Sequence, residues 1–167
     1  PVLQAALEEK WGLNKSLPEQ YLAYLSNAVQ GDLGTSIIYE RSVNDMIGEK
    51  VGATVLLGLT SAILALIIGT AMGIIAARHE GSAYDLVTSG ATYTMNSVPS
   101  FWLGLMLIIL FSTKLGWLPS YGMTTARKNF EGWAYVADVM RHMVLPVMTL
   151  TLVTIPQYFR TAKSAVL

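Results

Sequence analysis

Charged residues are absent from two long stretches of the chain, 51–77 and 86–113. Each stretch exceeds the roughly 20 apolar residues with which an α-helix crosses a hydrocarbon core of about 30 Å. A third uncharged stretch, 143–159, has about 17 residues and lies at the lower limit for a span. A soluble core would have to hide all three in a chain of only 167 residues. The pattern therefore predicts an all-α, polytopic transmembrane helix bundle, with spans over about 51–77, 86–113 and 143–162.

The first 50 residues carry most of the acidic groups and resemble a soluble segment. Ser16 and Glu19 form a capping-box pattern, with Pro18 in the tolerant first turn of a helix. Apolar residues then recur at helical spacing, at Leu22, Leu25 and Val29. Gly31 is a suitable residue to end the helix. We expect an amphipathic helix of about 14 residues, which is too short and too polar to cross a membrane.

A second capping pattern begins at Ser42 and predicts a helix that continues into the first span. Within that span, four small residues recur every fourth position: Ala65, Gly69, Gly73 and Ala77. Small residues in this register let two helix backbones approach closely in lipid, where no hydrophobic force drives helices together. Gly and Ala are also common in membrane helices without any such role. Because four positions are in register, we favour a packing face.

The second predicted span has two unlike halves, separated by Pro99. Its first half is rich in hydroxyl and amide side chains: Thr88, Ser89, Thr92, Tyr93, Thr94, Asn96 and Ser97. Its second half, 101–111, is strongly apolar. Proline removes a backbone hydrogen bond and kinks a helix, while a polar half-helix does not face lipid cheaply. The pattern is equally consistent with a water-filled path lined by these residues and with hydrogen bonds between helices.

A polar loop, 120–142, follows the second span. Aromatic residues suited to a membrane interface precede it, at Trp117 and Tyr121. Several apolar positions predict a short interfacial helix inside the loop: Trp133, Tyr135, Val136 and Val139. Two prolines predict a bend in the third span, Pro146 and Pro156. Two basic residues mark the exit of that span, Arg160 and Lys163.

The residues offer little chemistry of their own. The chain has no Cys, so disulfides, thiol catalysis and Cys-based zinc sites are excluded. Its two His, at 79 and 142, fall on opposite sides of the predicted membrane, and its eight Met share no face, so we expect no metal site. The formal net charge of zero does not favour a nucleic-acid partner. The uncharged stretches lack the ionisable group that proton- or ion-coupled transporters usually need.

Several short strings stand in order along the chain: Leu13-Asn14 to Tyr21-Leu22, Gly31-Asp32-Leu33-Gly34-Thr35-Ser36, Arg41-Ser42-Val43, Val98-Pro99-Ser100-Phe101-Trp102, Gly116-Trp117-Leu118-Pro119, His142-Met143-Val144-Leu145-Pro146 and Phe159 to Leu167. Together they resemble the permeases of oligopeptide, dipeptide and nickel ABC importers. Each string alone is weak, but the ordered set covers essentially the whole chain. The 120–142 loop matches the family only loosely, and Lys163 stands where Arg is more usual.

The resemblance implies a type I importer permease with six helices, of which this chain holds helices two to four. It implies that 1–50 is an external loop, that 51–167 is part of the transmembrane domain, and that 114–142 is also external. The turn at 78–85 and the residues from Arg160 onward would face the cytoplasm of a bacterial or archaeal cell. The chain starts at Pro1 without Met and stops at Leu167 inside an expected helix, so we interpret it as a piece of a longer protein.

The resemblance also assigns functional roles. The path or its hinge would be formed by Asn96, Ser97, Pro99 and Ser100. The coupling end would contain Arg160 and Lys163. The external loop, with Asp32 and Gly34, would face a substrate-binding protein. The partners would be a second, homologous permease, two ATPase subunits and the lipid bilayer. ATP and Mg would bind to the ATPases, so this chain would be no enzyme and would hold no cofactor.

Three functions stay open at this point. The first is a permease for dipeptides or oligopeptides. The second, in the same family, is a permease for nickel or a metal chelate, because selectivity lies mostly in the binding protein. The third, of another class, is a membrane scaffold that transports nothing and has no ATPase partner.

Overall fold

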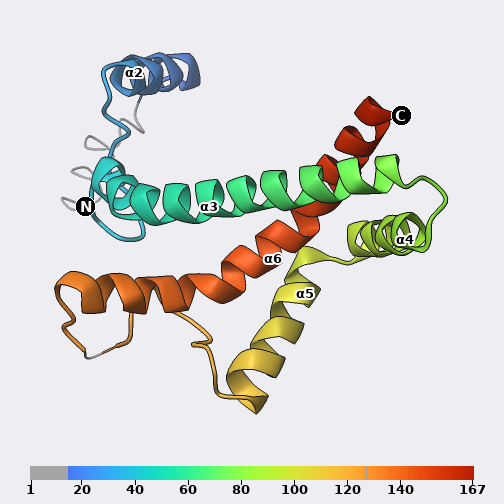
Figure 1. The fold of residues 1–167 in the computed structure, drawn as a ribbon. Coiled ribbons are helices and arrows are strands. Elements are labelled where there is room, and N and C mark those ends of the chain that lie inside the picture. The colour runs from blue at the N-terminus through green and yellow to red at the C-terminus, as the bar shows by residue number, and fades with distance from the viewer. Residues whose placement is uncertain (1–14, 127) are drawn as a thin grey trace. The chain divides into compact units, whose positions relative to one another are not determined.

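The computed structural model describes residues 15–126 and 128–167. Helices account for most of the described chain, and the only strand-like pairing there is an isolated bridge between Thr35 and Ser42. The elements are α2 (Leu17–Val29), α3 (Val43–Arg78), α4 (Ala83–Ser97), α5 (Ser100–Leu107), the π-helical segment η1 (Ile108–Lys114) and α6 (Gly132–Val166). Figure 1 shows their order. The chain forms two compact units, 1–52 and 53–167.

In the first unit, α2 has the start and the end that its sequence predicts. The carboxylate of Glu19 accepts hydrogen bonds from the backbone N–H of Ser16 at 3.0 Å and from its hydroxyl at 2.8 Å. These two hydrogen bonds stabilise the ionised form and hold the pKa of Glu19 below its ordinary value. At the other end, Gly31 has a φ of +86°, and its N–H donates to the carbonyl of Ala28 at 3.0 Å. The left-handed glycine therefore ends the helix, as expected.

The turn that follows α2 is held by side-chain amides and carboxylates. Asp32 Oδ1 accepts a hydrogen bond from the N–H of Gly34 at 2.8 Å, and Gly34 has a φ of +80°. Asn44, in the first turn of α3, accepts from the N–H of Leu33 at 2.9 Å and donates to the carbonyl of Gly31. Asp32 and Gly34 thus shape this loop through local contacts.

The first predicted span is longer than its uncharged stretch. Helix α3 has 36 residues and begins at Val43, directly after Ser42, where the second capping pattern predicts a helix start. By length and composition, α3 and α6 are each able to cross a membrane, and the bent pair of α4 with α5 and η1 would be a third span. This confirms the all-α, multi-pass class.

The second span differs from its prediction. A proline kink was expected in one continuous helix, but α4 and α5 are separate helices bent by 103°. Helix α4 has 15 residues and extends about 22 Å, which is less than the roughly 30 Å of a hydrocarbon core. Figure 1 shows the sharp change of direction between α4 and α5. Neither half crosses a membrane alone.

The third span begins earlier than predicted. The expected interfacial helix around Trp133 to Val139 is not separate, because it forms the first turns of α6, which runs unbroken to Val166. Both prolines, Pro146 and Pro156, lie inside this helix. Figure 1 shows α6 changing direction along its length, in line with the predicted bend.

Candidate functional site

The break between α4 and α5 is set by one proline. Val98 has extended backbone angles, φ −82° and ψ 126°, and ends α4 through its N–H, which donates to the carbonyl of Met95 at 3.2 Å. The residue before a proline is pushed out of the helical region by the proline ring. Pro99 is itself extended and caps α5, and its carbonyl accepts from the N–H of Leu103 at 3.1 Å. Pro99 has no N–H to leave unpaired at the start of α5, but no side chain caps the N–H groups of the turn that follows it.

The four residues assigned to the path surround this break and are all exposed in the described chain: Asn96, Ser97, Pro99 and Ser100. The hydroxyl of Ser97 donates to the carbonyl of Tyr93 at 3.2 Å, within α4. Ser100 lines a cavity of about 500 Å³, and the other three residues do not line it. Ser100 is thereby linked to a space large enough for a solute.

That cavity has a volume of about 500 Å³ and opens between helices α3, α5 and α6 and the segment 119–122. Its size lies within the range of small-molecule sites. The wall is mostly apolar, and its polar groups include the side chains of Ser100, Tyr121, His142 and Thr149. One turn along α5 from Ser100, a Cβ on Gly104 would lie 3.5 Å from the Thr149 methyl carbon, so α5 and α6 are in van der Waals contact at the cavity wall. The cavity therefore sits directly beside the α4–α5 break.

The hydroxyl groups of α4 bear on the two alternatives for its polar face. Most donate within their own helix, to carbonyls three or four residues earlier: Thr88, Thr92, Thr94 and Ser97. In the described residues, the only α4 hydroxyl bonded to another helix belongs to Ser89. Hydrogen bonding between helices thus explains the position of only one of these side chains in the described residues. The other hydroxyl groups of α4 form no hydrogen bond to another helix there.

A buried carboxylate holds the loop before α6. Asp138, on α6, accepts from the backbone N–H and the hydroxyl of Thr125, both at 2.6 Å. His142 lies one turn further along, and its Nδ1 is 2.8 Å from the carbonyl oxygen of Asp138. Arg141 donates to the carbonyl of Trp117 at 2.9 Å. The first turns of α6 therefore anchor the segment that borders the cavity.

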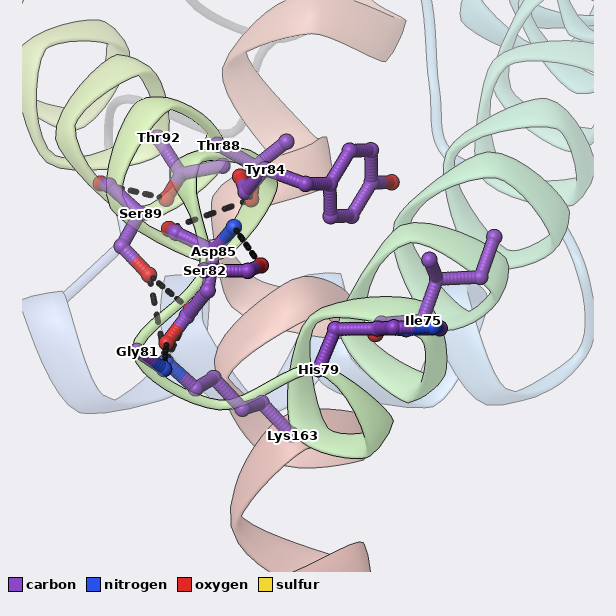
Figure 2. A network of polar contacts seen from close by, with 10 residues as sticks. All are labelled: Ile75, His79, Gly81, Ser82, Tyr84, Asp85, Thr88, Ser89, Thr92 and Lys163. Atoms are coloured by element: carbon purple, nitrogen blue, oxygen red, sulfur yellow. Dashed lines mark hydrogen bonds and ion pairs between the residues drawn. The ribbon is translucent and has the colours of Figure 1, made fainter.

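Lys163, expected at the coupling end, makes a contact that the sequence did not suggest. Its ammonium forms an ion pair with Asp85, the acidic residue in the first turn of α4. Figure 2 shows this pair with Ser89 and Gly81 around the same carboxylate. Arg160, the other residue assigned to the coupling end, is exposed and forms no ion pair within the described chain.

The four small residues of α3 are all buried: Ala65, Gly69, Gly73 and Ala77. The two glycines face α6. A Cβ on Gly69 would lie 2.9 Å from the carbonyl oxygen of Ile155, and one on Gly73 would lie 2.5 Å from that of Phe159. A hydroxyl bond joins the same helices, from Thr151 to the carbonyl of Ser61 at 3.4 Å. Helices α3 and α6 are thus in backbone contact, which only glycine permits at these positions.

No cluster of three or more His, Cys, Asp or Glu side chains in the described chain is placed to hold a metal ion. The two His lie apart: His79 contacts the carbonyl of Ile75 at the end of α3, and His142 lies on α6.

Sequence comparison finds relatives that are named as transport permeases. The oligopeptide transport system permease protein AppB of Bacillus subtilis is 38% identical over 143 residues, which cover 85% of this chain and 44% of that protein. A putative peptide permease protein of Brucella suis is 36% identical over 148 residues, and the aligned region covers 88% of this chain and 45% of that protein. The glutathione transport system permease protein GsiC of Escherichia coli strain K12 is 38% identical, over 86% of this chain and 42% of its own length.

The chain thus spans somewhat less than half the length of these relatives. The sequence model of one family, described as the binding-protein-dependent transport system inner membrane component, matches residues 69–167. The matched range contains the residues that form the α4–α5 break, the contact of Gly73 with α6 and the Asp85–Lys163 pair. The chain therefore belongs to the family of binding-protein-dependent transport system inner membrane components, and it is part of a multi-pass membrane protein.

Proposed function

We propose that the protein is a permease subunit of an ATP-driven importer that carries dipeptides or oligopeptides across the inner membrane of a bacterium. The family, and relatives named for oligopeptides, peptides and glutathione, support a peptide-type solute. Glutathione is itself a tripeptide, so these names share one chemistry. The chain would form part of the path and would hydrolyse no ATP.

One observation carries the proposal furthest: the α4–α5 break lies beside a cavity of about 500 Å³. A span broken at its middle leaves backbone groups that lipid does not satisfy, so such breaks occur where they face protein or water. Ser100 begins α5 on the wall of that cavity. We infer that Ser100 contacts the solute, and that Asn96, Ser97 and Pro99 form the hinge at the edge of the path.

The energy for transport would come from other subunits. We propose that a second, homologous permease completes the path, that two ATPase subunits bind ATP and Mg, and that an external binding protein delivers the solute. In this arrangement 1–50 and 114–142 face outside, and the turn at 78–85 and the end of α6 face the ATPases. The hydrogen bonds of Asp138 to Thr125 hold the loop before α6 in place, which supports a fixed surface on the outer side.

An uptake assay tests the proposal. The full-length permease is reconstituted in liposomes with its partner permease, its ATPases and its binding protein, and labelled di- and oligopeptides, glutathione and chelated nickel are offered with ATP inside. We expect ATP-dependent uptake of at least one peptide and no uptake of chelated nickel. Uptake of chelated nickel without uptake of any peptide would favour the alternative of a metal-chelate permease. Absence of an ATPase partner and of any solute-stimulated hydrolysis would instead favour a scaffold.

A further inference from the structure

The first turn of α4 and the last turns of α6 meet at one charged contact, which we name the α4–α6 junction: Gly81, Asp85, Ser89 and Lys163. The ammonium of Lys163 is paired with Asp85 Oδ1 and donates to the Ser89 hydroxyl at 3.3 Å. That hydroxyl donates to Asp85 Oδ1 at 3.0 Å. Asp85 Oδ2 accepts from the N–H of Gly81 at 3.1 Å. Figure 2 shows the Lys163 side chain reaching this carboxylate from α6.

Local structure holds both charges in place. Ser82 caps α4 by accepting from the N–H of Asp85 at 3.2 Å, so Asp85 lies in the first turn, where the helix dipole favours an anion. Lys163 lies in the last turn of α6, where the dipole favours a cation. The Asp85 side chain is 8% exposed and that of Lys163 is 21% exposed. Breaking such a pair would leave a largely buried carboxylate without its cation.

Helix α3 reaches the same place. A Cβ on Gly73 would lie 3.1 Å from the backbone nitrogen of Lys163, so α3 and α6 touch at the residue that carries the ammonium. The turn after α3 contains Gly81, which Asp85 also holds. Three helices are therefore fixed to one another at the junction, by a backbone contact and by an ion pair.

Further along α4 the packing is open. A cavity of about 420 Å³ lies among the three helices, with Ala91 and Met95 of α4 on one side and Leu152 and Ile155 of α6 on another. Its wall is mostly apolar, and within the described chain no hydrogen bond or ion pair links α4 to α6 along it. The junction is thus the tight connection between α4 and α6, and beyond it α4 leads to the Val98–Pro99 break.

We propose that the Asp85–Lys163 pair is a positioning contact that transmits movement of the α6 end to α4, and through α4 to the break beside the cavity. This inference rests on the proposed function, because the movement would originate in ATPase subunits that act near the end of α6. Lys163 acts through Asp85 and α4, and it touches no solute. Loss of the pair then uncouples ATP hydrolysis from transport, so that hydrolysis persists while peptide uptake falls.

The test compares peptide uptake per ATP hydrolysed in reconstituted full-length transporters. Asp85→Asn and Lys163→Met each remove one charge, and we expect the ratio to fall by at least about fivefold, the lower end of typical coupling between sites. Lys163→Arg keeps the charge and should stay near the unmodified ratio. Glu131→Gln is the charge control, because Glu131 is an exposed carboxylate without a side-chain capping bond and lies outside both the junction and the ATPase-facing turn. An unchanged ratio in both charge-removing variants would overturn the proposal.

A second measurement does not depend on the solute. Spin labels are placed at two exposed positions, Val87 on α4 and Ser164 on α6, through Cys substitutions. We expect one narrow distance distribution with and without trapped nucleotide, and a broad one in Asp85→Asn. A narrow distribution in that variant would show that other contacts fix α4 to α6, and would count against the pair as the link.

Two further cases keep the result interpretable. If Asp85→Asn does not assemble with its partners, Ser89→Ala removes only the supporting hydroxyl, and the ratio should fall about two- to tenfold, as for a lost hydrogen bond; no fall would refute the role of the junction. If the unmodified transporter takes up no peptide, the proposed function fails. The spin-label distances still decide whether the pair links the two helices.

Discussion

Gly73→Ala should strongly destabilise the permease, although the change adds a single methyl group. The new Cβ would lie 2.5 Å from the carbonyl oxygen of Phe159 and 3.0 Å from the Cβ of Ala162. The nearest obstacle is backbone, so no side chain can turn away and α3 must separate from α6. Overpacking of this kind typically costs about 1–3 kcal/mol, and Gly73→Val should cost more. Thermal unfolding of the purified full-length protein in detergent measures the loss.

Gly58→Ala is the matched control on the same helix. A Cβ at Gly58 would have no neighbour within 4 Å. Because alanine is favoured over glycine inside a helix by roughly 0.5–1 kcal/mol, this variant should be as stable as the unmodified protein or more stable. Equal stability of the Gly58 and Gly73 variants would mean that α3 and α6 do not touch as described.

Pro99→Ala should abolish most peptide uptake while leaving the transporter assembled. Without the proline ring, Val98 is free to become helical, and α4 and α5 can join into one helix. Alanine favours a helix interior over proline by about 3 kcal/mol, which corresponds to a factor of more than about 100 in the balance between straight and broken forms. A straight helix would carry Ser100 away from the cavity. We expect uptake to fall by about tenfold or more, measured beside co-purification of the partner subunits.

Pro99→Gly distinguishes the effect of losing the proline ring from the effect of losing the broken helix. Glycine also lacks the ring, but it disfavours a helix interior by about 1 kcal/mol relative to alanine, so the broken form should be about fivefold more populated than in Pro99→Ala. Uptake by Pro99→Gly should therefore exceed that by Pro99→Ala. Similar uptake by both would argue that the ring contributes something other than the break, and an equal loss of assembly would argue against a role in gating.

The sequence predicted the elements where one local signal dominates. The capping box at Ser16 and the glycine at 31 placed both ends of α2, because each is a short-range hydrogen-bond pattern. The long uncharged stretches identified the membrane helices, because a run of about 20 apolar residues is visible directly in the sequence. The start of α6 was missed, since Asp138, Arg141 and His142 interrupt the apolar pattern. In the structure Thr125 satisfies Asp138, which lets the helix continue through these polar residues.

The form of the break and the α4–α6 junction depended on contacts that a single sequence does not display. Pro99 signals an interruption, but a kink and a 103° break have the same local sequence. Asp85 and Lys163 are 78 residues apart, and each alone is typical of a charged helix end. Their opposite charges at the ends of two antiparallel predicted spans were the available hint, which is weak because many such pairs are possible.

The central claim is that the α4–α5 break borders the solute path. Its most direct test is the reactivity of Ser100→Cys toward a membrane-impermeant thiol reagent in the assembled full-length transporter, with Leu105→Cys as the control on α5, a position exposed but away from the cavity wall. The account predicts that the cysteine at 100 reacts, that trapped nucleotide changes its rate, and that peptide protects it, whereas the cysteine at 105 shows none of these effects. A cysteine at 100 that stays unreactive in every nucleotide state, or that peptide never protects, would contradict it.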